Sequence, residues 1–242
     1  MPRFFLAPEL LTSSSALLTG EHAAHAKVLR LRAGDRVTLC DGAGTDYPGS
    51  IESAEPGCYR VALDPAEPSA SEPDVAVTVY MAFSKADKFE HVIQKATELG
   101  ASAVVGFPSA RCVARPDERI AKKLDRWQKI ALSAAEQSGR GRIPQVRALG
   151  SYTEAVAEAA QADLPLFFYE NEKTVRLSGA LSGRAPRSVS LMTGPEGGFE
   201  PAEVEAAERA GLQSCSLGPR ILRCETAPLC ALSAVMFALG QL

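Results

Sequence analysis

The sequence changes character near residue 70. The segment "DPAEPSASEPD", residues 64–74, holds three prolines and no large apolar side chain, which is typical of a linker. Upstream of this linker the chain predicts short strands, whereas downstream it predicts strands and helices in alternation. A chain of 242 residues is long enough for two domains of ordinary size. We therefore predict one domain over residues 1–70 and a second over residues 71–242.

The first domain is predicted to be a small β-barrel. The runs "DRVTLCDGAG", "YPGSIES" and "CYRVALD" alternate apolar and polar residues, and glycine, aspartate and proline separate them. This pattern is typical of short antiparallel strands. A short helix is predicted within "GEHAAHAKVLRLRAG", residues 20–34, and it brings the basic residues Lys27, Arg30 and Arg32 close together.

The second domain is predicted to be an α/β fold with a parallel sheet. Buried strands are predicted at residues 75–83, 102–107, 164–171 and 188–194. Helices are predicted at residues 87–100, about 118–138, 201–211 and 227–240. The first of these helices has one apolar stripe, with Asp87 placed to cap its start and Gly100 its end. Strands and helices that alternate in this way form parallel sheets covered on both faces.

Composition narrows the classes of function. Six cysteines occur without a C-x-x-C pair, so we predict free thiols in the cytoplasm and no metal site. The chain lacks both a signal peptide and an apolar run of about 18 residues, so we predict no membrane segment.

Basic residues are concentrated in one segment of an otherwise acidic chain. The net charge is −3, yet residues 111–147 carry ten Lys or Arg and four Asp or Glu. A localised basic surface is typical of proteins that bind a polyanion without being basic throughout. The alternative is a helix face whose charges contact only water.

Three segments follow predicted strands at one edge of the sheet. They are "FFYEN" (167–171), "TGPEGGF" (193–199) and "LGPRILRCETA" (217–227). Ligands of open α/β sheets bind beyond the carboxyl ends of the strands, so we predict a binding site there. In the last segment Ile221 and Leu222 are flanked by charged residues, which suits an adenine ring beside a charged reaction centre.

The glycine-rich segment is predicted to place bare backbone against a ligand. Its glycines allow a tight turn before a helix that begins near Pro201, although Glu200 is a weaker N-cap than Ser, Thr, Asp or Asn. The motif differs from the common phosphate-binding patterns, and the Glu196 carboxylate suits a cationic or hydroxyl-bearing ligand. A purely structural turn is the alternative.

Four motifs in this order resemble those of the small-subunit rRNA uracil-N3 methyltransferases (the RsmE type), which belong to the SPOUT superfamily. They are "SKADKFEHVIQKATELG", "RWQKIALSAAEQSGR", "TGPEGGFEPAE" and "LGPRILRCETA". The run "HAKVLRLRAGDRV" extends the resemblance over nearly the whole chain. This chain has Ala86 where the family usually has Gly, Glu200 where Ser is common and Cys224 where Thr is usual. These departures leave every charged motif residue in place.

The resemblance implies a PUA-like β-barrel followed by a SPOUT α/β methyltransferase domain with a deep trefoil knot and a mostly parallel sheet. In that family the three loops form the knot and bind S-adenosylmethionine in a bent shape, without a metal. The resemblance also implies a homodimer with the site near the subunit interface. The implied partner is 16S rRNA, preferably in the assembled small ribosomal subunit.

The resemblance and the chemistry of uridine N3 together assign roles to the loop residues. The N3 lone pair is available only after the imide proton leaves, so the site must orient the reactants, promote proton loss and stabilise charge on the carbonyl oxygens. We expect Arg223 to favour the uracil anion, and Glu196 or Glu225 to act as the base or to bind ribose hydroxyls. The expected cofactor-binding residues are Phe168, Tyr169, Glu170, Thr193, Gly194, Pro195, Glu196, Gly197, Gly198, Leu217, Gly218, Ile221, Leu222, Arg223, Thr226 and Ala227.

Basic residues are expected to hold the RNA. A methyl group on N3 blocks the pairing edge, so the target base must be unpaired or extruded, and single-stranded or looped RNA is the natural substrate. Contacts to phosphates would position this RNA without reading its sequence. The expected RNA-binding residues are Lys27, Arg30, Arg32, Lys85, Lys88, Arg111, Lys122, Arg126, Gln137, Arg140 and Arg142.

Three alternatives remain open from the sequence. The first is a SPOUT enzyme that methylates a ribose 2′-hydroxyl or another base. The second is an RNA-binding protein without catalytic activity. The third is a phosphate- or nucleotide-binding enzyme that uses the glycine-rich turn.

Overall fold

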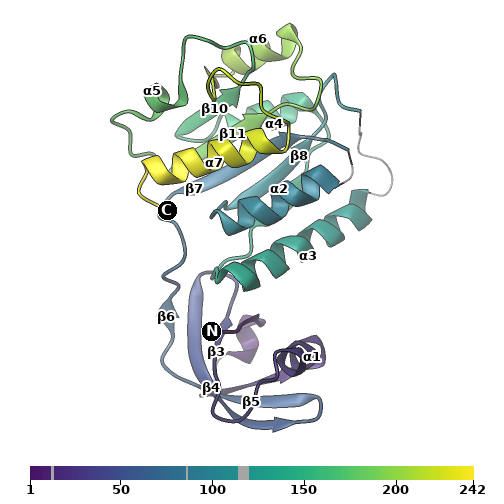
Figure 1. Ribbon diagram of the computed structural model, residues 1–242, viewed down its shortest axis with the longest axis vertical. Coiled ribbons are helices and arrows are strands. Elements are labelled where there is room, and N and C mark those ends of the chain that lie inside the picture. The colour runs from purple at the N-terminus through teal and green to yellow at the C-terminus, as the bar shows by residue number, and fades with distance from the viewer. Residues whose placement is uncertain (12–13, 86, 114–119) are drawn as a thin grey trace. The chain divides into compact units, whose positions relative to one another are not determined.

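The computed structural model describes residues 1–11, 14–85, 87–113 and 120–242. These residues form two compact units (Figure 1). The first unit contains Met1–Glu72 together with Ala135–Ile143, and the second contains Pro73–Ala134 and Pro144–Leu242. Ala86 and the first residues of the helix expected at about 118–138 lie outside the described residues.

The first unit is built on one mixed sheet. Its strands are β1 (Arg3–Phe5), β2 (Ser15–Thr19), β3 (Arg36–Cys40), β4 (Thr45–Glu55), β5 (Cys58–Leu63) and β6 (Glu67–Pro68), with a 3₁₀ turn η1 (Pro8–Leu10). The order is β1-β3-β4-β5-β2, with β6 paired to β4, and every pair except β1 with β3 is antiparallel. A register shift between Ile51 and Ser53 bends β4. The sheet curls around a core that includes Phe4, Leu39 and Val61.

The helix α1 (Gly20–Val28) packs against β2 and β5. A helix is confirmed within residues 20–34, but it ends at Val28. The Leu31 N–H donates to the Ala26 carbonyl at 3.1 Å, and the Arg30 N–H donates to the Lys27 carbonyl at 3.0 Å. This pair of bonds forms a Schellman cap, in which the left-handed position is normally glycine. Arg30 occupies that position here, with φ of 57°.

The second unit contains a sheet in which all neighbouring strands are parallel. Its strands are β7 (Ala76–Ala82), β8 (Ala103–Phe107), β9 (Gln145–Ala148), β10 (Leu164–Phe168), β11 (Ser188–Thr193) and β12 (Gln213–Cys215), in the order β12-β10-β11-β7-β8-β9. The parallel sheet and its predicted strands are confirmed, while the short strands β9 and β12 were not predicted. Phe168 pairs with both Thr193 and Cys215, so β10, β11 and β12 end at the same level.

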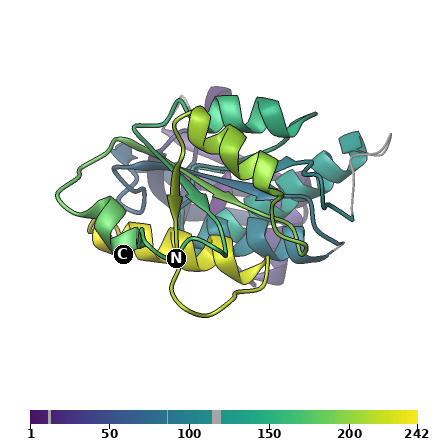
Figure 2. The same cartoon turned by 90° about the horizontal axis from the view of Figure 1, so that it is seen from above.

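Helices cover both faces of this sheet, as predicted (Figures 1 and 2). On one face α2 (Asp87–Glu98) contacts α7 (Thr226–Ala238), and α4 (Tyr152–Ala159) and α6 (Pro201–Arg209) lie on the other. The unit also contains α5 (Leu177–Leu181) and most of α3 (Ile120–Ser138). The Trp127 ring of α3 lies 4.7 Å from the Phe89 ring of α2, measured between centroids. Gly100 follows α2 with φ of 93°, which fits the predicted cap.

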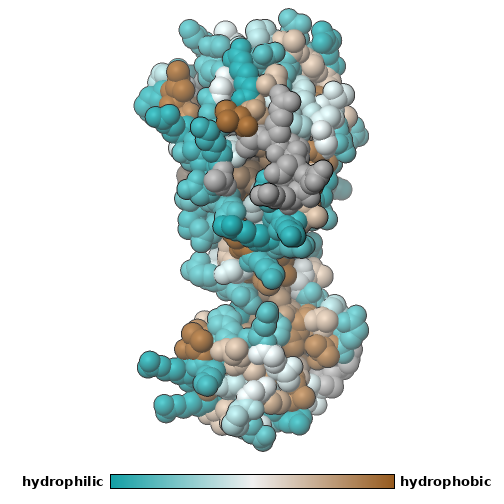
Figure 3. Space-filling view, turned by 90° about the vertical axis from the view of Figure 1, so that its right-hand side faces the viewer, coloured by the Kyte–Doolittle hydropathy of each residue, from teal (hydrophilic) through white to brown (hydrophobic). Residues whose placement is uncertain are grey.

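Polar side chains predominate on the face of the second unit drawn in Figure 3. Within the described ranges, no helix combines the length and the apolar character needed to cross a membrane. Large apolar side chains that are exposed include Val28 and Leu29 in the first unit and Ile221 and Phe237 in the second.

Candidate functional site

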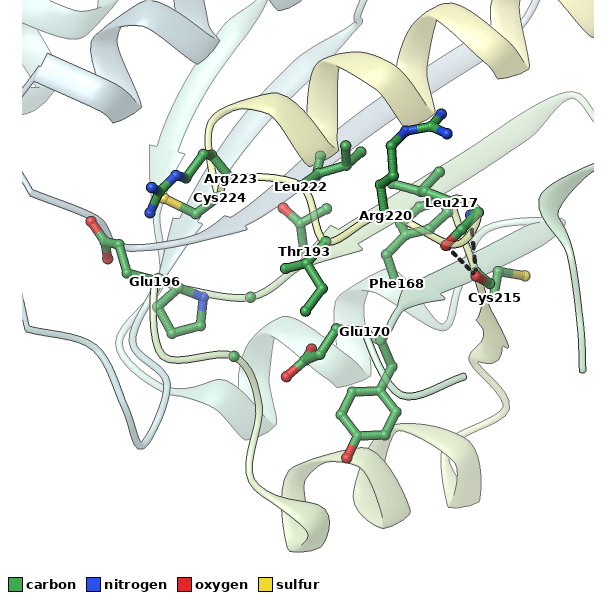
Figure 4. A pocket seen from close by; sticks show the side chains of 18 of the residues that line it. Phe168, Glu170, Thr193, Glu196, Cys215, Leu217, Arg220, Leu222, Arg223 and Cys224 are labelled. Carbon is green, nitrogen blue, oxygen red and sulfur yellow. Dashed lines mark hydrogen bonds between the residues drawn. The ribbon is translucent and has the colours of Figure 1, made fainter. Parts of the chain in front are cut away.

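A cavity of about 490 Å³ lies at the carboxyl edge of the parallel sheet, beyond β10, β11 and β12 (Figure 4). The three loops predicted to meet at this edge all line it. Of the residues predicted to bind a cofactor, every one except Thr226 lines the cavity, and Thr226 is the first residue of α7. The lining also includes Lys88, Cys215, Ser216, Pro219, Arg220 and Cys224, which the sequence did not assign to a cofactor.

Two glycines fix the shape of the glycine-rich loop. Gly198 has φ of 68°, and a Cβ at this position would collide with the Glu170 carboxylate. A Cβ on Gly197 would come within 3.0 Å of the Arg111 Cβ. The Gly198 N–H donates to the Pro195 carbonyl at 3.0 Å, which closes the turn. The loop therefore presents main chain at this wall of the cavity, and a side chain on either glycine would require Glu170 or Arg111 to move.

The same loop enters α6 through a capping box. Glu200 is the N-cap, and its N–H donates to the Glu203 carboxylate at 2.9 Å. Glu203 is buried and also accepts hydrogen bonds from the Ser109 hydroxyl at 3.2 Å and the Ala110 N–H at 2.9 Å. The reciprocal pair compensates for a glutamate at the cap, and Glu203 fixes the start of α6 to the segment that follows β8.

The third loop brings apolar side chains to the cavity and ends at a helix start. Leu217 and Leu222 line the cavity and are partly buried. Ile221 also lines it, yet Ile221 is 85% exposed. The Thr226 N–H donates to the Arg223 carbonyl at 2.9 Å as α7 begins. The loop is therefore anchored at its end, while its apolar side chains remain accessible to a ligand.

Lys88 connects the second and third loops. Its ammonium lies 3.5 Å from the Glu196 carboxylate and 3.2 Å from the Glu225 carboxylate. It also lies 3.5 Å from the Cys224 sulfur, and the Lys85 N–H donates to Glu196 at 3.2 Å. A residue expected to hold RNA phosphates is therefore part of the cavity wall. The sequence contained a signal for this place, since α2 follows β7, whose carboxyl end lies at the same edge.

These contacts set the ionisation of the residues around Lys88. Burial opposes the charges of Glu196 and Glu225, but backbone hydrogen bonds and Lys88 outweigh it and lower the pKa of both carboxyl groups. The hydrogen bond to Glu225 raises the pKa of Lys88. Burial, together with the neighbouring carboxylates, raises the pKa of the Cys224 thiol to about 12. At neutral pH this corner therefore holds one ammonium, two carboxylates and an uncharged thiol.

The two arginines of the third loop lie at different ends of the cavity. Figure 4 shows Arg223 at the end near Glu196 and Arg220 at the opposite end. Both side chains are exposed, and within the described part of the chain neither makes an ion pair. Arg223 is therefore a cation available to a ligand at the end of the cavity where Lys88 and its carboxylates lie.

Several residues expected to bind RNA are engaged within the protein. Arg140 is 3% exposed, and its guanidinium pairs with the Glu72 carboxylate at 2.7 Å. This ion pair is buried in the first unit, so the Arg140 guanidinium is not exposed to an RNA phosphate. Arg126 pairs with Glu90 at 2.6 Å on the surface, and Arg111 donates to the carbonyl of Gly197 at 3.0 Å.

The other residues expected to bind RNA are exposed. Arg115 and Arg119 of the basic segment lie outside the described residues. The exposed set is Lys27, Arg30, Arg32, Lys85, Lys122, Gln137 and Arg142.

The six cysteines are free thiols, and four of them are buried. Across residues 1–11, 14–85, 87–113 and 120–242, no group of three His, Cys, Asp or Glu side chains is placed to hold a metal ion.

Comparisons with known proteins agree with this architecture. A family model described as an RNA methyltransferase domain matches residues 71–236, and one described as an RNA methyltransferase PUA domain matches residues 18–57. A parallel α/β sheet with a cavity at its carboxyl edge, preceded by a PUA domain, defines the chain as an RNA methyltransferase.

Relatives identify the family within this class. The ribosomal RNA small subunit methyltransferase E of Bacillus subtilis (strain 168) is 35% identical over 249 residues, which cover 98% of this chain and 96% of that protein. The Mycobacterium bovis protein of the same name is 36% identical and covers 93% of this chain and 87% of its own length. The crystal structure of a ribosomal RNA small subunit methyltransferase E from Neisseria gonorrhoeae bound to S-adenosyl methionine matches with a TM-score of 0.85 and 34% identity, covering 98% of this chain and 97% of that one. This chain belongs to the ribosomal RNA small subunit methyltransferase E family.

Proposed function

We propose that this protein transfers a methyl group from S-adenosylmethionine to N3 of a specific uridine in 16S ribosomal RNA. The observation that carries the proposal is the cavity, because its three loops are those that resemble the uracil-N3 methyltransferases. The Neisseria gonorrhoeae relative, solved with S-adenosyl methionine, matches this chain over nearly its whole length.

The cavity fits S-adenosylmethionine in three respects. The main chain of Gly197 and Gly198 borders the cavity without side chains. Leu217 and Leu222 offer apolar contact to an adenine ring, and the Glu170 carboxylate suits a ribose hydroxyl or a cation. We assign cofactor binding to the predicted residues that line the cavity, apart from the Arg223 side chain. When bound, S-adenosylmethionine supplies an electrophilic methyl group carried on a sulfonium.

Arg223 is the residue that we assign to the uridine. The N3 proton must leave before the N3 lone pair can attack a methyl group, and negative charge then develops on the uracil carbonyl oxygens. An exposed guanidinium without a carboxylate partner in the described part of the chain favours that charge. The place of Arg223 at the end of the cavity near Glu196 supports this assignment.

Glu196 and Glu225 are assigned to positioning rather than to proton transfer. A carboxyl group whose pKa is lowered is a weaker base than one with an ordinary pKa. Both carboxylates hold the Lys88 ammonium, and through it they join the second and third loops. This connection keeps the two loops in register on either side of the cavity.

The two domains have separate roles in this proposal. Residues 1–70 bind RNA, and residues 71–242 hold the cofactor and carry out the transfer. Exposed Lys27, Arg30 and Arg32 contact phosphates in the first domain, while Lys85 and Lys122 do so in the second. Because phosphate contacts release counterions, the affinity for RNA falls steeply as salt is added. The relatives are named for the small subunit, so we propose the assembled small subunit or its rRNA as the partner.

We also propose that the protein is a cytoplasmic homodimer that acts without a metal. The helix α7 is apolar on most sides, yet Phe237 is 75% exposed and Cys230 is exposed as well. A helix that is apolar all round is normally buried all round, so a second copy of the chain is the partner that we assign to this surface. Sedimentation velocity of Phe237→Glu, expected to shift a dimer to a monomer, tests this part.

Substitution of Arg223 tests the catalytic assignment. We expect Arg223→Ala to reduce turnover by about 10²- to 10³-fold, the usual cost of losing one group that stabilises a developing anion. Calorimetry should show S-adenosylmethionine binding retained. Arg220→Ala, in the same loop but at the other end of the cavity, should lose less turnover. Unchanged turnover in Arg223→Ala would remove Arg223 from the mechanism.

A further inference from the structure

The turn that follows β8 is anchored to the start of α6. We call residues 109–112 the β8 turn. The Ser109 hydroxyl and the Ala110 N–H both donate to the buried Glu203 carboxylate. The turn is also closed on itself, because the Cys112 N–H donates to the Ser109 carbonyl at 3.1 Å and the Ser109 N–H donates to the Cys112 sulfur at 3.2 Å. Arg111 therefore extends from a main chain that is fixed on both sides.

Arg111 holds one peptide of the glycine-rich loop. Its guanidinium donates to the Gly197 carbonyl at 3.0 Å, while the Gly198 N–H of the same peptide donates to the Pro195 carbonyl at 3.0 Å. The C=O and N–H of a trans peptide point in opposite directions, so these two bonds hold the peptide from both sides. Among the described residues, the cavity lining includes Gly197 and Gly198 but not Arg111. Arg111 thus acts on the cavity through the loop and not by direct contact.

A loop of this composition needs such a constraint. Three of the five residues from Gly194 to Gly198 are glycines, and glycine loses more backbone freedom on ordering than any other residue. If the loop were free before binding, the ligand would have to order it, and affinity would be lower by that cost. A hydrogen bond that already holds the loop in the empty protein reduces this cost.

We propose that Arg111 is a positioning residue for S-adenosylmethionine, because its hydrogen bond to the Gly197 carbonyl orders the glycine-rich loop before the cofactor binds. The inference rests on the proposed function for the choice of ligand. The alternative is that Arg111 is a surface cation that contacts RNA. The structure favours positioning, since the guanidinium is engaged by Gly197 and its Nε lies 3.8 Å from the carboxylate of Glu200, the N-cap of α6.

Arg111→Met removes the donor and keeps an unbranched side chain beside Gly197. Calorimetry should show the Kd for S-adenosylmethionine rise about five- to tenfold, the range expected for a partly exposed hydrogen bond from a charged donor. The apparent KM for the cofactor should rise in parallel, whereas kcat at saturating cofactor should change less than about twofold, because the bound cofactor then orders the loop. The melting temperature should hold, since Arg111 is exposed. Arg111→Lys keeps one donor and should be intermediate.

Hydrogen exchange in the protein without cofactor reports the order of the loop directly. Peptides that cover residues 194–200 should exchange faster in Arg111→Met than in the unaltered protein. Saturating S-adenosylmethionine should narrow this difference. The rest of the second unit should exchange as in the unaltered protein, which separates positioning of one loop from a general loss of structure.

Arg209→Met is the matched control. Arg209 lies on α6, the helix that the glycine-rich loop enters, and its side chain is 72% exposed in a pair with Glu205 at 3.7 Å. The same substitution therefore removes the same charge without removing the bond to Gly197. Cofactor affinity and loop exchange should both remain unchanged. Affinity for protein-free 16S rRNA, followed by fluorescence anisotropy, is measured for both variants.

Four outcomes would overturn the proposal. The first is an unchanged cofactor Kd and unchanged loop exchange in Arg111→Met. The second is a loss of RNA affinity with cofactor affinity intact, which would make Arg111 an RNA contact. The third is an equal loss of cofactor affinity in Arg209→Met, and the fourth is faster exchange throughout the unit with a lower melting temperature. Absence of methyl transfer to N3 would contradict the proposed function, whereas cofactor affinity and hydrogen exchange still decide the role of Arg111.

Discussion

The basic residues at the end of α1 in the first unit, Lys27, Arg30 and Arg32, differ from Lys88 in the second unit in whether a carboxylate compensates their charge. Lys88 lies between two carboxylates, and the pKa of each carboxyl group is lowered, so these charges are compensated within the protein. The side chains of Lys27, Arg30 and Arg32 make no ion pair within the described ranges, and the one carboxylate beside them is Asp35, which accepts from the Arg32 main-chain N–H at 2.7 Å. A basic residue in a sequence is therefore a candidate RNA contact only where the fold brings no acid to it.

Arg140→Ala is expected to have the largest effect, and it acts on stability. The side chains of Arg140 and Glu72 are 4% and 13% exposed, so removing the arginine leaves a buried carboxylate without its cation. The free energy of unfolding, measured by chemical denaturation, should fall by about 3–5 kcal/mol. Arg142→Ala, close by in the chain but exposed, should remain much closer to the unaltered protein. If Arg140→Ala keeps its stability but loses RNA affinity, the conclusion that an arginine paired within the protein does not bind RNA would be contradicted.

Lys88→Met is expected to act next most strongly, on catalysis. Without the ammonium, Glu196 and Glu225 repel each other and the two loops lose their connection. We expect kcat/KM to fall by about 10- to 100-fold, because small displacements of positioned groups are costly. Calorimetry should show weaker S-adenosylmethionine binding, with Lys88→Arg intermediate. Loss of RNA affinity with cofactor binding intact would instead indicate that Lys88 contacts RNA.

The dependence of cofactor affinity on pH tests whether the carboxylates around Lys88 stay ionised at neutral pH. The pKa values of Glu196 and Glu225 are lower in the folded protein than in the unfolded chain. The contribution of these two carboxylates to the free energy of unfolding is therefore fully present above the ordinary carboxyl pKa, about 4.3. It is lost as the pH falls through the lower pKa values of the folded protein. S-adenosylmethionine affinity, followed by calorimetry, should be flat between about pH 6 and pH 8. An acid limb of kcat/KM in that range would indicate a carboxyl group that acts as the base.

Arg126→Ala is expected to have the smallest effect. Arg126 is 71% exposed in its pair with Glu90, and exposed pairs contribute less than about 1 kcal/mol to the free energy of unfolding. Because Glu90 already compensates its charge, the loss of RNA affinity should be smaller than in Arg30→Gly. Anisotropy titrations of the two variants side by side give the comparison. A larger loss of RNA affinity in Arg126→Ala would indicate that α3, and not the end of α1, makes the main RNA contact.

Local patterns allowed much of the fold to be predicted. The apolar stripe of α2 and the buried runs of β7, β10 and β11 are visible within a few residues of sequence. The meeting of three loops followed from strand direction, because parallel strands end at one edge. The strands β9 and β12 have four and three residues, too few for a period to be recognised. The knot rests on the resemblance alone, since general rules of connectivity argue against it.

The partners of charged residues could not be predicted in the same way. Glu72 and Arg140 are far apart in the sequence, as are Lys88 and its two carboxylates, so no local pattern reports either contact. For this reason the sequence alone places both Arg140 and Lys88 among the RNA-binding residues. The left-handed conformation of Arg30 was also hidden, because glycine is the usual residue at that position of a helix end.

The proposed function requires that a methyl group is transferred to N3 of a uridine in the cavity. Its most direct test incubates small ribosomal subunits from a strain lacking this gene with the protein and with S-adenosylmethionine that carries a deuterated methyl group. The rRNA is then digested, and its nucleosides are identified by mass spectrometry. We expect deuterated 3-methyluridine, strongly reduced with Arg223→Ala. A label on a ribose 2′-oxygen or on another base, or no label at all, would contradict this role.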